Sequence, residues 1–204
     1  LVNYLKPIAA AAPDAKFYFY HMPSATGVPV DMKTFIPMAV EQIPNFGGIK
    51  YTHEDLTEFK ACIDEWDGQL DLLFGRDELL LEALAIGTRG AVGSFYNLIP
   101  GVFQKMIVAH QRGRASEARQ CAEYAKRLIS RVLKFNLLPA SKFLLSRAGF
   151  CAPNVRSPLE MLALESTELL LETVASLGPL PSDTGQPHFL EATESAVKEP
   201  LTRK

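Results

Sequence analysis

Apolar and polar positions along the first half of the chain alternate between two periods. Short runs rich in aromatic and β-branched residues are typical of buried strands. Each run is followed by a longer segment whose apolar residues recur every three or four positions, as on an amphipathic helix. The predicted strands cover residues 16–20, 47–50, 70–74 and 90–94. The predicted helices cover residues 31–43, 56–66, 78–86 and 97–107, and residues 1–12 resemble the end of a further helix.

Four successive strand-then-helix units predict parallel strands joined by crossover helices, which is an α/β fold. The units lack a glycine-rich phosphate-binding fingerprint. Their spacing suits a (β/α)8 barrel, but only residues 1–110 follow the alternating pattern, whereas an eight-unit barrel needs about 250 residues. The sequence therefore predicts four βα units, or half of a barrel.

The remainder of the chain is predicted to be helical. Residues 114–135 carry a sustained apolar stripe, and residues 140–148 suit a shorter helix. The sequence Ser157-Pro158-Leu159-Glu160 has the form of a capping box with proline at the first helical position, so it predicts a last helix that Gly178 ends. We expect residues 111–178 to form a helical extension, and residues 179–204 to form a disordered tail because prolines, serines, threonines and charges dominate there.

Composition narrows the classes of protein to consider. A net charge of -2 gives no basic surface for nucleic acid, and no apolar run is long enough to span a membrane. Three widely spaced cysteines do not suggest a disulfide framework. These features predict a cytoplasmic protein that binds neither nucleic acid nor membrane.

The stretch Gly47-Gly48-Ile49-Lys50-Tyr51-Thr52 holds the residue with the clearest chemical potential. It suits a buried strand that ends on a lysine, and Thr52 is placed to cap the following helix. An exposed lysine has a pKa near 10.4, and burial lowers that value, which increases the fraction of free amine available for Schiff-base chemistry. The alternative is a lysine that extends from the strand end to water.

Further polar residues follow the same pattern along the chain. Tyr20, the segment Gly75 to Glu78, and Ser94 each fall at or just beyond the C-terminal end of a predicted strand, as Lys50 does. Parallel strands bring these ends together on the face where barrel enzymes build active sites. Each residue alone also suits a structural role, as a core aromatic, a helix cap or a turn residue. Together they predict a site with an amine, a phenol, two carboxylates and a hydroxyl.

The residues also carry a family resemblance. The succession Tyr20-His21-Met22-Pro23, Gly48-Ile49-Lys50-Tyr51-Thr52, Gly75-Arg76-Asp77-Glu78 and Gly93-Ser94-Phe95-Tyr96-Asn97 resembles the C-terminal half of the N-acetylneuraminate lyase family. That family belongs to the class I aldolase superfamily that also holds dihydrodipicolinate synthase. Its members are (β/α)8 barrels and typically homotetramers. The resemblance covers residues 1–177.

The resemblance implies roles for individual residues. Lys50 matches the lysine that forms the Schiff base with the substrate ketone, and Tyr20 matches the tyrosine that shuttles the proton. The positions that match those holding the polyhydroxylated part of the substrate are Thr52, Gly75, Asp77, Glu78 and Ser94. The implied reaction needs no cofactor, and its partners are a 2-keto sugar acid and pyruvate.

The chain departs from the family pattern in three ways. His21 stands where many relatives have asparagine. Arg76 occupies a variable position, where one reading is that it tunes which sugar acid fits and the favoured reading is a solvated loop arginine. His21 and His53 are expected near the rim, but no Asp or Cys accompanies them at metal-ligand spacing, so no metal is predicted. The family's Gly-Ser/Thr-Thr-Gly-Glu loop, which binds the pyruvoyl carboxylate, does not occur in this sequence.

Two alternatives to a sialic acid lyase stay open at this point. One is another pyruvate-dependent aldolase that acts on a different 2-keto sugar acid. The other is a truncated, non-catalytic subunit that associates with intact subunits, because a half barrel has open strand edges and an uncovered interior.

Overall fold

A computed structural model describes residues 1–178, and the predicted tail at residues 179–204 lies outside the described residues. The chain divides into two compact units, one from Leu1 to Gly93 and one that begins at Ser94. The predicted boundary at residue 110 rests on the repeat pattern and stays a prediction. Each unit is described by itself.

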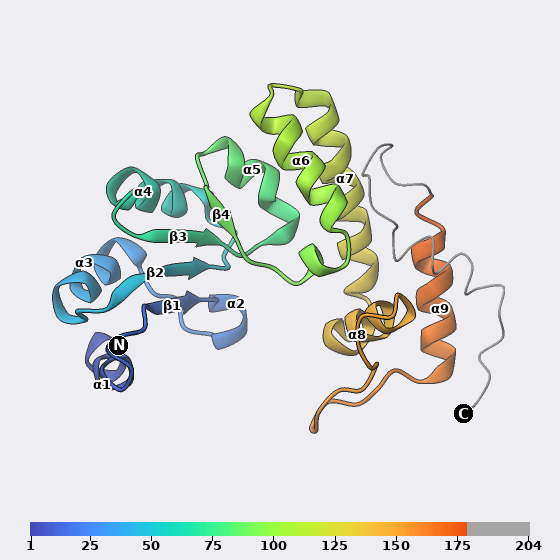
Figure 1. Cartoon of the computed structure of the whole chain (residues 1–204), viewed down its shortest axis with the longest axis horizontal. Coiled ribbons are helices and arrows are strands. Elements are labelled where there is room, and N and C mark those ends of the chain that lie inside the picture. Colours follow the sequence, from blue (N-terminus) through green and yellow to red (C-terminus); the bar gives the residue numbers. More distant parts are fainter. Residues whose placement is uncertain (179–204) are drawn as a thin grey trace. The chain divides into compact units, whose positions relative to one another are not determined.

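The first unit is built on a four-stranded parallel sheet in the order β1-β2-β3-β4 (Figure 1). The strands are β1 (Phe17–His21), β2 (Phe46–Tyr51), β3 (Asp71–Phe74) and β4 (Gly90–Ala91). The predicted α/β class with a parallel sheet is therefore confirmed, although β4 is shorter than the predicted strand at residues 90–94. That these units form the C-terminal half of a barrel stays a prediction.

Helices pack against one face of this sheet. They are α1 (Val2–Ala10), α3 (Met32–Gln42), α4 (Leu56–Trp66) and α5 (Leu80–Ala85), and a short helix, α2 (Pro23–Thr26), follows β1. Side chains alternate along a strand, so Ile49 and Tyr51 enter the core together with Leu72 and Phe74. All four are 8% exposed or less.

The opposite face of the sheet carries polar side chains that interact across the strands. The hydroxyl of Tyr18 on β1 donates a hydrogen bond to Asp71 on β3. Gly48 lies between them in register on β2, where any side chain would enter the β3 backbone, because a Cβ would come within 2.0 Å of the Asp71 carbonyl oxygen. Glycine at position 48 therefore lets β2 and β3 approach closely. It also leaves room for the hydrogen bond between Tyr18 and Asp71 to cross β2.

Two helices of this unit begin at aspartate caps. Asp31 accepts a hydrogen bond from the Thr34 amide at the start of α3, as predicted. For α4 the predicted cap, Thr52, is wrong: Asp55 accepts the amide hydrogens of Thr57 and Glu58. Asp55 lies directly before the first helical residue, so its carboxylate reaches amides that Thr52 does not.

The second unit is helical over its described residues. It contains α6 (Pro100–Gln111), α7 (Ala115–Val132), α8 (Leu137–Arg147) and α9 (Leu164–Ala175). The predicted start of the last helix at Ser157 is wrong, because α9 begins after Ala163. Leu159 and Met161 are 38% and 53% exposed, whereas the buried face of the helix starts at Thr167, so the residues upstream have no apolar surface to cover.

Within the described part of the chain, no helix combines the length and apolar character that a membrane span requires. The three cysteines, Cys62, Cys121 and Cys151, are all free thiols, and Cys151 alone is exposed.

Candidate active site

Strand register brings Lys50 and Tyr20 together. Tyr20 on β1 pairs with Lys50 on β2, and Lys50 pairs with Leu73 on β3. Lys50 lies between two core-facing residues and therefore projects from the other face of the sheet. Its Nζ atom lies 4.0 Å from the centre of the Tyr20 ring. The strand does not end on Lys50 as predicted but continues to Tyr51, and Lys50 is only partly buried.

The Tyr20 side chain is accessible. The residue is 46% exposed, and its hydroxyl donates a hydrogen bond to the Met22 sulfur at 3.2 Å. A thioether is a weak acceptor, so a stronger acceptor on a ligand can replace this bond. The phenol is thus available for proton transfer beside the amine.

Thr52 and Gly75 meet where β2 and β3 end. The Thr52 amide donates to the His21 carbonyl at 2.8 Å, and the Gly75 amide donates to the Tyr51 carbonyl at 2.7 Å. The Thr52 side chain is buried, and within the described residues its hydroxyl makes no hydrogen bond. A Cβ at Gly75 would lie 1.9 Å from that hydroxyl oxygen, so only glycine allows this approach.

Asp77 lies in close contact with another glycine, Gly93. Its side chain is 6% exposed, at the start of the 3-10 turn η1 (Asp77–Leu79). A Cβ at Gly93 would lie 1.5 Å from the Asp77 Oδ1 atom, so Gly93 leaves room for this carboxylate. In the sequence, Gly93 is distinguished only as part of the Gly93-Ser94-Phe95-Tyr96-Asn97 motif. The signal for its role was its place two residues after β4, where close approach to a neighbouring loop favours glycine.

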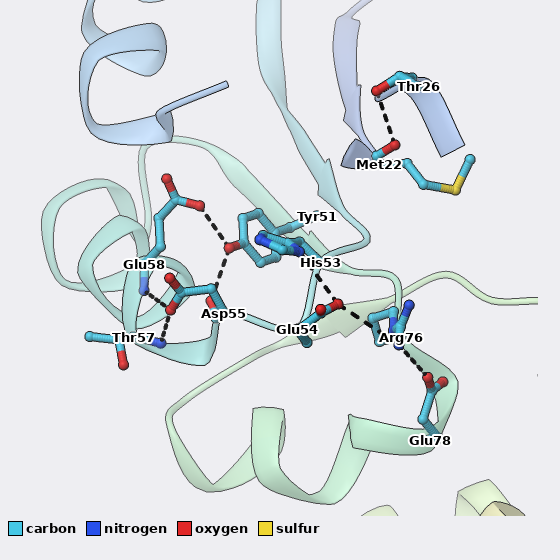
Figure 2. A network of polar contacts seen from close by, with 10 residues as sticks. All are labelled: Met22, Thr26, Tyr51, His53, Glu54, Asp55, Thr57, Glu58, Arg76 and Glu78. Atoms are coloured by element: carbon cyan, nitrogen blue, oxygen red, sulfur yellow. Dashed lines mark hydrogen bonds and ion pairs between the residues drawn. The ribbon is translucent and has the colours of Figure 1, made fainter. Parts of the chain in front are cut away.

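Glu78 belongs to a chain of polar and charged side chains at the strand ends (Figure 2). The Arg76 Nη2 atom lies 3.0 Å from Glu78 Oε1 and 3.9 Å from Glu54 Oε2. Glu54 in turn lies 3.5 Å from the Nδ1 atom of His53. The expectation of a solvated loop arginine is therefore wrong: the Arg76 side chain is only 30% exposed, and its guanidinium lies between a carboxylate of η1 and one of the loop between β2 and α4.

His21 lies on the helix side of the sheet rather than among the site residues. It is 2% exposed and lies beside Tyr51, with the two rings tilted and their centres 5.2 Å apart. Burial lowers the pKa of His21, the Glu58 carboxylate opposes this effect, and His53 adds to it. The Tyr51 hydroxyl donates to Glu58 at 2.7 Å and to the Asp55 carbonyl at 2.9 Å (Figure 2), and burial raises the pKa of Tyr51.

One part of the predicted site falls outside this geometry. Ser94 is the first residue of the second unit, so the arrangement of the first unit does not include it. Residues 1–178 hold no group of three or more His, Cys, Asp or Glu side chains arranged to bind a metal ion.

The remaining arrangement joins an amine and a phenol on neighbouring strands with a buried hydroxyl and two carboxylates at the strand ends. An amine beside a proton-transfer group can form and hydrolyse an imine with a carbonyl compound. Carboxylates and hydroxyls at the same edge can bind the hydroxyls of that compound. The arrangement therefore suits covalent catalysis on a hydroxylated carbonyl substrate.

Comparison with known proteins agrees with this chemistry. The family model described as the dihydrodipicolinate synthetase family matches residues 1–177. The chain is 36% identical to N-acetylneuraminate lyase of Pongo abelii, over 82% of this chain and 53% of that protein. It is 35% identical to N-acetylneuraminate lyase of Sus scrofa, over 88% of this chain and 57% of that protein.

Solved structures give the same result. The N-acetylneuraminate lyase of Aliivibrio salmonicida matches with a TM-score of 0.81 and 34% identity, over 88% of this chain and 59% of that one. The N-acetylneuraminate lyase of Proteus mirabilis matches with a TM-score of 0.81 and 30% identity, over 88% and 60%. The chain thus spans about half the length of the curated relatives that it matches.

Proposed function

Because the chain belongs to the dihydrodipicolinate synthetase family, we propose that it carries the lysine-bearing part of a class I aldolase. The proposed reaction is the cleavage of N-acetylneuraminate to N-acetylmannosamine and pyruvate. The similarity to N-acetylneuraminate lyases supports this substrate. We further propose that the four βα units are the second half of a (β/α)8 barrel, that the enzyme is a cytoplasmic homotetramer, and that the pyruvoyl carboxylate binds to the other half of the barrel.

One observation carries this proposal: the Lys50 amine lies 4.0 Å from the Tyr20 ring, on the face of the sheet opposite the core that the first unit's helices form. A Schiff-base aldolase needs a nucleophilic amine, and it needs a proton-transfer group within reach of the bond that breaks. Parallel pairing of β1 with β2 supplies both from adjacent strands.

The proposed chemistry begins when the uncharged Lys50 amine attacks the C2 ketone of the sugar acid and water leaves. The resulting iminium withdraws electrons from the C3–C4 bond. Tyr20 assists removal of the proton from the C4 hydroxyl, the C3–C4 bond breaks, and its electron pair forms an enamine of pyruvate. The C4 hydroxyl oxygen becomes the aldehyde of N-acetylmannosamine. The enamine then takes a proton at C3, and water releases pyruvate from Lys50. The iminium is the electron sink, so this route uses no metal and no organic cofactor.

The residues at the strand ends would hold the sugar chain. The Thr52 hydroxyl is buried and has no hydrogen-bond partner among the described residues, so a substrate hydroxyl can satisfy it. Asp77 and Glu78 supply carboxylate oxygens, each of which accepts hydrogen bonds from hydroxyls. From the family resemblance, Ser94 is proposed to contribute a further hydroxyl.

Release of pyruvate from N-acetylneuraminate tests the proposed function. The assay uses the 204-residue chain and the longest natural form of the protein that contains it. Lys50→Ala is expected to abolish the release. Lys16→Ala is a matched control, because Lys16 is an exposed lysine that precedes β1 and pairs with Asp71 at 3.6 Å. Its activity is expected to equal that of the parent.

The outcomes separate the candidate functions. Release of pyruvate from another 2-keto sugar acid but not from N-acetylneuraminate would favour a different aldolase of the superfamily. Absence of activity in every form, together with stable association between the 204-residue chain and a longer form, would favour a non-catalytic subunit. The exposure of two aromatic side chains on one face of the first unit's sheet, Tyr18 at 37% and Tyr20 at 46%, is the observation that favours association.

A further inference from the structure

Arg76 connects two loops at the end of the sheet. It lies in the segment between β3 and η1, and its Nη2 atom contacts Glu78 on its own segment at 3.0 Å. The same nitrogen lies 3.9 Å from Glu54, in the loop between β2 and α4. The Arg76 side chain is 30% exposed, and its Nε atom is enclosed by protein. The guanidinium is therefore held in place rather than extended into solvent (Figure 2).

This arrangement fixes the Glu78 carboxylate. A glutamate side chain has several rotatable bonds, so its carboxylate samples many positions unless a partner holds it. Arg76 contacts Oε1, which leaves Oε2 to accept a hydrogen bond. Arg76 also places one positive charge between two carboxylates that would otherwise repel each other across the loops.

We propose that Arg76 is a positioning residue that orients Glu78 toward the hydroxylated tail of the sugar acid and thereby determines how well that tail is recognised. The inference rests on the proposed function, because it assigns Glu78 to substrate binding. Arg76 acts through Glu78 and does not contact the reacting carbonyl. Its effect should appear in binding of the sugar portion and not in formation of the Schiff base with pyruvate.

Arg76→Gln tests the proposal. The side chain of glutamine is uncharged, so the variant loses the ion pair and releases Glu78. We expect the KM for N-acetylneuraminate to rise about tenfold while kcat changes less than about twofold, since a charge-assisted contact of this kind is worth about a factor of ten or more. Arg76→Lys restores a point charge without the planar fork, so its KM should lie between those of the parent and Arg76→Gln.

Arg89→Gln is the matched control. Arg89 also pairs with a carboxylate, as its Nη2 atom lies 2.6 Å from Asp67, but the pair lies before β3 and β4, at the opposite ends of the strands. Its KM is expected to equal that of the parent. A general loss of stability caused by removal of an arginine would affect both variants, whereas loss of Glu78 orientation affects Arg76→Gln alone.

The dependence of KM on ionic strength distinguishes a positioning role of Arg76 from a purely structural one. The Arg76–Glu78 pair is partly exposed, so salt screens it as the Debye length falls from about 30 Å at 0.01 M to about 3 Å at 1 M. The parent loses part of the benefit of the pair at high salt, and Arg76→Gln has none to lose. The ratio of the two KM values should therefore fall as salt is raised.

Borohydride trapping with pyruvate distinguishes failure of the proposed Arg76 role from failure of the proposed aldolase function. Equal adduct in the parent and in Arg76→Gln, with a KM ratio of about ten, supports the inference. Equal adduct with a KM ratio below about two would overturn the role of Arg76 and leave the aldolase assignment standing. No adduct in the parent would overturn the proposed function, and the inference with it.

Discussion

Gly75→Ala tests how closely the end of β3 approaches Thr52. A Cβ at position 75 would lie 1.9 Å from the Thr52 hydroxyl oxygen, 3.0 Å from the Thr52 Cβ and 3.2 Å from the Tyr51 carbonyl oxygen. Ordinary contact begins at 3.4 Å, so the Cβ and the hydroxyl must separate by about 1.5 Å. Thr52 is 9% exposed and β-branched, and therefore has little freedom to move.

The expected cost is that of overpacking a buried site, about 1–3 kcal/mol in the free energy of unfolding of the first unit. Thr52→Ala removes the crowded oxygen. Because this hydroxyl has no hydrogen-bond partner among the described residues, the substitution alone should change stability by less than about 0.5 kcal/mol. Gly75→Ala in the Thr52→Ala background should cost less than about 1 kcal/mol, which gives a coupling energy of about 1–2 kcal/mol.

Urea unfolding followed by fluorescence measures these energies. Trp66 is the single tryptophan of the chain and lies at the end of α4, so its emission reports on the first unit. The parent, the two single variants and the double variant form one cycle. Equal costs of Gly75→Ala in both backgrounds would refute the contact between Gly75 and the Thr52 hydroxyl.

Two further predictions concern the phenol and the buried imidazole. Tyr20→Phe should lower the rate of pyruvate release at least about a hundredfold, because it removes the proton-transfer group. Trapping of pyruvate by borohydride should persist, because the Lys50 amine is still present. An unchanged rate would indicate that Tyr20 has only a packing role. Burial lowers the pKa of His21 in the folded state, with Glu58 opposing and His53 assisting. Its contribution to stability is therefore complete above the unfolded pKa of about 6.5 and is lost as pH falls toward the folded pKa. Urea unfolding at several pH values should show this loss in the parent and a smaller one in His21→Gln.

Periodicity in the sequence was sufficient to predict the sheet of the first unit and its covering helices. The alternation around Lys50 predicted a strand, and parallel pairing brought Lys50 beside Tyr20, as the register confirms. Both results follow from local spacing and from the rule that successive βα units form parallel strands. Such features repeat along the chain and are visible without coordinates.

Features that depend on the distance between loops were not predictable. The bridge from Arg76 to Glu54 joins residues more than twenty positions apart, and no periodic signal relates them. The contacts of Gly75 and Gly93 likewise depend on how near two strand ends lie. Helix starts failed for a related reason: capping residues occur at several positions, and the apolar surface that is available decides which one is used. This explains why α9 begins after Ala163 and not at Ser157.

The central claim is that Lys50 forms a Schiff base. The most direct test is borohydride reduction in the presence of pyruvate, followed by intact mass measurement and peptide mapping, on the 204-residue chain and on the longest natural form that contains it. Reduction of a pyruvate imine converts it to a stable secondary amine on the lysine. We expect one adduct, mapped to Lys50, in the longer form, and none in Lys50→Ala. An adduct at another lysine, or no adduct in any form, would contradict the assignment of Lys50 as the nucleophile.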